Sequence, residues 1–134
     1  MPGLLLEAEV DAKDNSEQTA LHLAAKGGHT EVVKLLLENG AEINSPGGLY
    51  GRPLQHAVRS RNEALVRLLL DKGADINAQG GVTKSALIEA VDLGLEGLVR
   101  LLVENGANVN AKGPEYHDST PLQLAVRMGR KAIV

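Results

Sequence analysis

A short pattern recurs three times along the chain at a fixed interval of 33 residues. A Gly-Ala pair stands at 40–41, 73–74 and 106–107, each time after an apolar run and before an Ile-Asn or Val-Asn pair. Self-similarity at such a period is typical of stacked repeats, in which each unit buries its apolar face against its neighbours. The interval therefore predicts an array of small units rather than one bulky globular core.

Composition narrows the classes of function. The 134 residues include no Phe, Trp or Cys and only two Tyr, so the core must consist of Leu, Val, Ile and Ala, and thiol chemistry is excluded. A net charge of −3 provides no basic field for nucleic acid. The apolar run 4–6 is too short for a signal peptide or a membrane span. We expect an intracellular protein, cytoplasmic or nuclear, that binds neither nucleic acid nor membrane.

Each unit contains signals for two helices. Thr19, Ser85 and Thr120 can accept hydrogen bonds from free N–H groups at a helix start, and Pro53 and Pro121 suit the first helical position. The second helix of each unit is apolar around most of its circumference, which implies packing on its own partner helix and on the next unit. It carries cations at matching outward positions, namely Lys34, Arg67 and Arg100. A left-handed glycine is expected to end it, at Gly40, Gly73 and Gly106.

The stretch from Thr19 to Ala25, followed by Gly28-His29 and residues 31–37, resembles the ankyrin repeat pattern T-P-L-H-x-A-A, G-H-x-E-V-V-K-L-L-L. The resemblance covers about residues 11–134. It implies an all-α ankyrin-repeat solenoid of stacked helix–loop–helix units with projecting β-hairpin-like loops, whose concave face is made by loop tips and first helices. The whole chain, 1–134, is then one domain of partial and full repeats with boundaries at 1–13, 14–46, 47–79, 80–114 and 115–134.

Departures from the family pattern are also informative. In the family the side chains matching Thr19 and His22 tie the helix start together, whereas the next unit has Arg52 and Gln55, so that its tie is either absent or rebuilt. The loop 47–51, Gly-Gly-Leu-Tyr-Gly, is similar to a variant of fungal ankyrin arrays that are often fused to nucleotide-binding signalling ATPases. The resemblance also matches three loop asparagines to residues hydroxylated in some members: Asn44, Asn77 and Asn110.

No pattern of catalytic or metal-binding residues is visible. The four histidines are not paired at the spacings typical of metal sites, and the glycines at 47, 48 and 51 are not followed by the Lys-Ser/Thr of a phosphate-binding loop. We therefore predict no enzyme, no cofactor and no metal. An enzyme would need a ligand-filled cleft lined by His56 or His117.

Surface recognition has better support. Both tyrosines lie in the loops, and Tyr offers a large contact area with a hydroxyl group, although Tyr50 can alternatively pack between adjacent loops. Basic residues on the same face favour an acidic or phosphorylated protein or peptide segment. The predicted partner-binding residues are Leu49, Tyr50, Arg52, Arg59, Val82, Lys84, Tyr116, His117 and Arg127. The competing interpretation is a structural or sensor segment of a larger, ATPase-fused signalling protein, without a ligand of its own.

The two ends of the chain match complementary halves of one second helix. Residues 129–134 resemble its first half, and residues 4–7 resemble its second half. We expect a monomeric segment of a longer array. The alternative is head-to-tail self-association, in which one molecule completes the helix pair of the next.

Overall fold

The computed structural model describes residues 10–79 and 85–109 of the chain. Within these ranges the protein is all-α and contains no strand. The elements in chain order are α2 (Ala20–Lys26), α3 (Thr30–Glu38), the 3-10 turn η1 (Gly48–Tyr50), α4 (Pro53–Arg59), α5 (Glu63–Asp71), α6 (Ala86–Asp92) and α7 (Glu96–Glu104).

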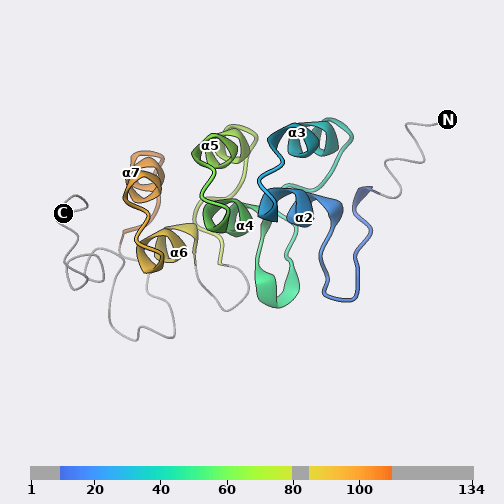
Figure 1. Ribbon diagram of the computed structural model, residues 1–134, viewed down its shortest axis with the longest axis horizontal. Coiled ribbons are helices and arrows are strands. Elements are labelled where there is room, and N and C mark those ends of the chain that lie inside the picture. Colours follow the sequence, from blue (N-terminus) through green and yellow to red (C-terminus); the bar gives the residue numbers. More distant parts are fainter. Residues whose placement is uncertain (1–9, 80–84, 110–134) are drawn as a thin grey trace.

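The helices form two layers that repeat from unit to unit (Figure 1). The first helices α2, α4 and α6 each have 7 residues and lie side by side in one row; the second helices α3, α5 and α7 each have 9 residues and form the other row. Loops project from the first-helix row, away from the second helices. The predicted ankyrin-type solenoid is confirmed.

Small residues allow the first helices to pack closely. Ala24, Ala57 and Ala90 occupy equivalent positions and are all buried. In agreement, α2 packs on α4 and α4 on α6, while each first helix also packs on the second helix of its own unit. The core is therefore a continuous layer of Ala, Val and Leu running through the array.

The same position of the second helices is buried to different extents along the array. Leu65 of α5 and Leu98 of α7 are 0% and 4% exposed, but the equivalent Val32 of α3 is 48% exposed. The predicted outward cations are confirmed, since Lys34, Arg67 and Arg100 are all exposed.

Helix starts and ends follow the sequence signals. The hydroxyls of Thr19 and Ser85 accept hydrogen bonds from backbone N–H groups in the first turns of α2 and α6, and Pro53 is the first residue of α4. The glycines after the second helices have φ angles of 90°, 99° and 94°, the left-handed region predicted for Gly40, Gly73 and Gly106. Thr120 and Pro121 lie outside the described residues.

A periodic set of side-chain hydrogen bonds joins consecutive units at the bases of the loops. The side-chain Oδ1 atoms of Asp11, Asn44 and Asn77 each accept a hydrogen bond from the backbone N–H 31 residues further on, at 2.9, 2.8 and 2.7 Å. Of these residues, Asn44 and Asn77 were predicted only as sites of modification. In the structure they hold the spacing between units.

Candidate recognition surface

The loop of the first unit is held against its helix by a buried histidine. Backbone N–H of Thr19 donates to Nδ1 of His22 at 3.0 Å, so Nε2 carries the hydrogen and donates to the Ser45 carbonyl at 2.8 Å. Burial lowers the pKa of His22, which is consistent with this neutral ring. The predicted tie between Thr19 and His22 is confirmed, and it extends to the next loop.

The second unit makes the same connections with different residues. Oε1 of Gln55 accepts from the backbone N–H of Arg52 at 3.0 Å, and Nε2 of Gln55 donates to the Ala78 carbonyl at 2.9 Å. Gln55 follows His22 by 33 residues, and Ala78 follows Ser45 by the same interval. Of the two expectations for this unit, the structure therefore supports a rebuilt tie.

These ties position the loop that carries η1. Gly47 is buried at its start, where its carbonyl accepts from Nε2 of Gln18, and a Cβ there would lie 2.2 Å from the Gly51 carbonyl oxygen. Close approach of the backbone thus explains the glycine at this position. The tip beyond it presents two apolar side chains to solvent: Leu49 is 76% exposed and Tyr50 is 52% exposed. Tyr50 is therefore not buried between adjacent loops.

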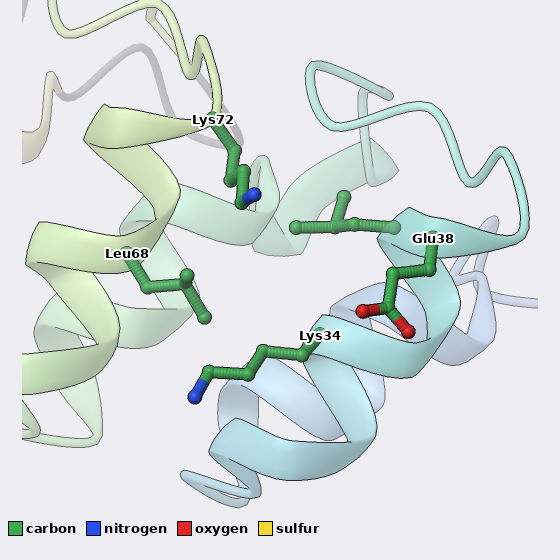
Figure 2. Close-up of a pocket in the computed structure, with 5 residues that line it drawn as sticks. Lys34, Glu38, Leu68 and Lys72 are labelled. Atoms are coloured by element: carbon green, nitrogen blue, oxygen red, sulfur yellow. The ribbon is translucent and has the colours of Figure 1, made fainter.

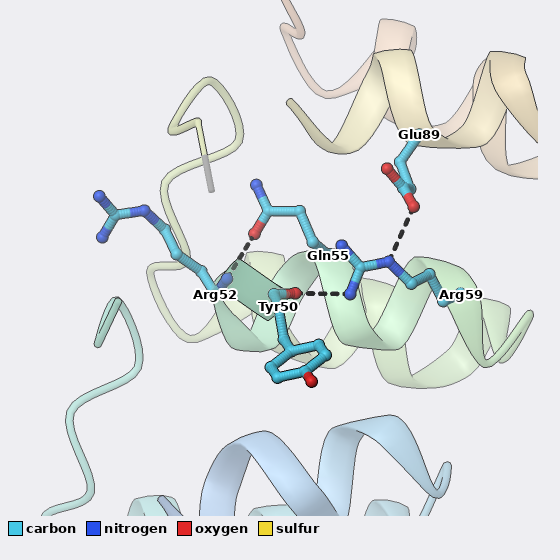
Figure 3. A network of polar contacts seen from close by, with 5 residues as sticks. All are labelled: Tyr50, Arg52, Gln55, Arg59 and Glu89. Carbon is cyan, nitrogen blue, oxygen red and sulfur yellow. Dashed lines mark hydrogen bonds and ion pairs between the residues drawn. The ribbon is translucent and has the colours of Figure 1, made fainter. Parts of the chain in front are cut away.

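An arginine joins this loop to two first helices (Figure 3). Nη1 of Arg59 on α4 donates to the Tyr50 carbonyl, and its Nε pairs with Oε1 of Glu89 on α6 at 2.7 Å. Glu89 is only 8% exposed, so this ion pair is poorly screened by water. Arg59 thus holds the position of Tyr50 relative to α4 and α6.

A hollow of about 430 Å³ lies between this loop and the first helices, and it is lined by Lys26, Leu49, Tyr50, His56 and Arg59. His56 is 2% exposed and its Nε2 has no hydrogen-bond partner among the described residues. Burial, followed by the nearby charges of Arg59, His22 and Lys26, lowers the pKa of His56 to about 4. At neutral pH the hollow therefore combines two cations, a neutral imidazole and two apolar side chains.

A second hollow of about 220 Å³ opens between α3 and α5 (Figure 2). It is lined by Lys34, Leu37, Glu38, Leu68 and Lys72. Both lysines are exposed, Lys34 already pairs with Glu31 at 3.4 Å, and no lining polar group is buried. This hollow lacks the held polar groups that a specific site needs.

The structure brings together three of the predicted partner-binding residues, since Leu49, Tyr50 and Arg59 line the same hollow. Arg52 holds two neighbouring loops, since its Nε donates to the Gln79 carbonyl at 3.0 Å and its Nη1 to the Asn44 carbonyl. The other predicted residues lie outside the described part of the chain: Val82, Lys84, Tyr116, His117 and Arg127.

Two lining residues were absent from the predicted set. His56 was considered only as part of an enzyme cleft, and Lys26 was not among the predicted binding residues. The 33-residue interval contains the missing signal, because Lys26 precedes Arg59 by one period. Asp92 on α6 occupies the same repeat position in the third unit. A comparison of equivalent positions in the first helices would therefore have placed Lys26 beside the predicted site.

Within residues 10–79 and 85–109, no three His, Asp or Glu side chains are grouped so that they could hold a metal ion. None of the described helices has the length and apolar character needed to cross a membrane.

Stacked helix pairs joined by projecting loops and periodic hydrogen bonds define an α-solenoid repeat protein. The profile of the family "Ankyrin repeats (3 copies)" matches residues 3–80, and that of "Ankyrin repeat" matches residues 84–114. The chain belongs to the ankyrin repeat family. Ankyrin repeats are protein–protein interaction modules, and neither match indicates a catalytic family.

Similar proteins share only part of their length with this chain. It is 36% identical over 59 residues to the NF-kappa-B inhibitor cactus of Drosophila melanogaster, covering 43% of this chain and 12% of that protein. It is 47% identical over 58 residues to an ankyrin repeat protein of Rickettsia bellii, covering 43% and 22%. It is 56% identical over 41 residues to human Caskin-2, covering 30% and 3%. The chain thus matches less than a quarter of each relative.

Proposed function

We propose that this chain recognises a segment of a partner protein on the first-helix face, meaning the surface formed by α2, α4, α6 and the loop 47–52. The observation that carries this proposal is the pair Leu49 and Tyr50. Both are exposed, although the loop below them is held by hydrogen bonds from Gln18 and Arg59. Apolar side chains fixed in position at the rim of a hollow lose little entropy on binding.

Tyr50 is well suited to anchor a partner. Its ring offers a large contact area while losing the freedom of only two side-chain torsions. Arg59 fixes its backbone, and the ring lies beside the hollow rather than filling it. Removal of Tyr50 and Leu49 should therefore weaken binding without disturbing the core, because neither residue is part of it.

The test is a peptide-display selection on the full chain, followed by binding measurements with L49A/Y50A. We expect the selected peptides to lose at least about 10-fold in affinity for this variant. The matched control is R67A on α5, an exposed side chain in the other helix layer, and it should change affinity less than 2-fold, a limit of about 0.4 kcal/mol. Thermal melts establish that both variants remain folded. Peptides that bind L49A/Y50A as tightly as the wild type would place the binding surface elsewhere.

A second candidate function is a structural segment of a longer protein that binds no partner by itself. The observation that favours it is the small share of each relative, between 3% and 22%, that this chain matches. The same display selection separates the two functions, because a purely structural segment would yield no peptide that depends on Leu49 and Tyr50.

A further inference from the structure

We propose that the hollow beside Tyr50 receives a carboxylate side chain, Asp or Glu, from an extended partner segment, with the ammonium group of Lys26 as its main ion-pair partner. An apolar residue next to the acid would pack on Leu49 and Tyr50. This inference rests on the proposed function and specifies the chemistry of the partner at that same site.

The charges around the hollow favour an anion. Lys26 on α2 and Arg59 on α4 line it, and none of its described lining residues is acidic. Arg59 is already engaged by Glu89 and by the Tyr50 carbonyl, so its role is to hold the site. Lys26 is exposed and forms no ion pair within the described part of the chain. It is the cation that remains available to a ligand.

His56 adds a second argument. It lines the hollow, it is almost fully buried, and its Nε2 lacks a partner among the described residues. Arg59 on its own helix and Lys26 on α2 both disfavour a positive charge on this imidazole, and the neutral ring of His22 lies 5.6 Å from it. Glu89 on α6 is held by Arg59. The hollow thus has a positive field, which an entering carboxylate would offset.

The lining also distinguishes a carboxylate from a phosphate group. A phosphorylated side chain carries nearly two negative charges and is usually bound by several arginines. Among the described lining residues, Lys26 is the one uncommitted cation, and Leu49 and Tyr50 present apolar surface. A single negative charge next to an apolar residue matches this arrangement better.

The test uses peptides selected by display on the full chain. We expect Asp or Glu at one position, next to an apolar residue. The best peptide is then synthesised with its acid, with the amide isostere Asn or Gln, and with phosphoserine at that position. Against the wild type, the acid should bind about 5- to 10-fold more tightly than the amide, and more tightly than phosphoserine. Against K26Q, the acid and the amide should bind within 2-fold of each other.

The control variant is K34Q, which removes an exposed helix lysine from the opposite layer and should leave the preference for the acid unchanged. Selected peptides that need Leu49 and Tyr50 but carry no acid would overturn this inference while leaving the proposed function intact. An acid preference that persists in K26Q, or a preference for phosphoserine, would also overturn it. A selection without any peptide that depends on Leu49 and Tyr50 would overturn both proposals.

Discussion

The first and second units tie their loops to their helices with the same geometry but with different chemistry. In the first unit, the imidazole of His22 accepts one backbone hydrogen bond and donates another to the Ser45 carbonyl. In the second unit, the amide of Gln55 does both, and its donor reaches the Ala78 carbonyl. Both side chains are buried, at 0% and 1% exposure.

The difference shows what this position demands of a residue. It requires one acceptor and one donor that flank a single carbon atom of a planar group, on a side chain of suitable length. Imidazole and carboxamide both satisfy this demand, but only imidazole titrates near neutral pH. The third unit has Ile88 at the equivalent position, which has no polar side-chain atom, while its helix start keeps the hydroxyl cap of Ser85. The helix cap and the loop tie are therefore separable.

The largest effect should come from removing the tie of the first unit. H22A leaves the Thr19 N–H and the Ser45 carbonyl without their buried partner and also opens a cavity. We expect a loss of about 3–4 kcal/mol in the free energy of unfolding. Urea melts at pH 7.5 measure it, with Q55A as the comparison in the second unit. A loss below 1 kcal/mol would mean that the tie contributes little to stability.

Lowering the pH should reduce the free energy of unfolding through the buried imidazoles, whereas the amide of Gln55 does not titrate. The native pKa of His56 is lowered to about 4, whereas an unfolded chain takes up that proton near the ordinary value of 6.5. Between these values the unfolded state binds more protons, so the free energy of unfolding falls as the pH decreases from 6.5 to 4. His56 alone accounts for about 3 kcal/mol of this loss. The lowered pKa of His22 acts in the same direction.

The check is H56L, since leucine occupies the equivalent position 23 of the first unit. Its free energy of unfolding should fall less steeply than that of the wild type between pH 6.5 and 4. The control H29Q alters an exposed histidine and should keep the wild-type slope. Parallel slopes for H56L and the wild type would contradict the assignment.

A smaller loss of stability is expected at the position after the second helix, which holds a glycine in each described unit. Gly73 has a φ angle of 99°, and a Cβ built there meets no atom within 4 Å, so G73A should cost only backbone strain. We expect about 1 kcal/mol from a urea melt. G97A in α7 is the matched control: Gly97 is exposed and helical, and alanine is a better helix former, so that variant should be neutral or stabilising.

The smallest effect should follow from exchanging one tie for the other. Q55H places in the second unit the ring that the first unit uses, and at pH 7.5 the free energy of unfolding should change by less than about 1 kcal/mol. The variant should also lose more stability than the wild type as the pH falls to 5. Unfolding of Q55H at neutral pH would show that the two units demand more than shared hydrogen-bond geometry.

Much of the fold could be predicted because its signals are local. These signals are a hydroxyl before the first helix, a proline at its first position and a glycine after the second helix. Each acts within one turn of backbone, and the 33-residue period repeats them. The recognition surface was harder to predict from the sequence. Arg52 and Arg59 were predicted alike as binding residues, but Arg59 pairs with Glu89, 30 residues away, while Arg52 donates to carbonyls of two loops. Such partners depend on how units stack.

The ankyrin solenoid and the left-handed conformation of the glycines at 40, 73 and 106 could be derived from the sequence alone, because the period and the short-range backbone preferences suffice for these. The folded structure was needed to show that Gln55 replaces His22, that Asp11, Asn44 and Asn77 connect successive units, and that Lys26 and His56 share a hollow with Tyr50. The hydrogen bonds among these contacts join residues 23 or 31 positions apart, and their geometry exists only after neighbouring units have packed.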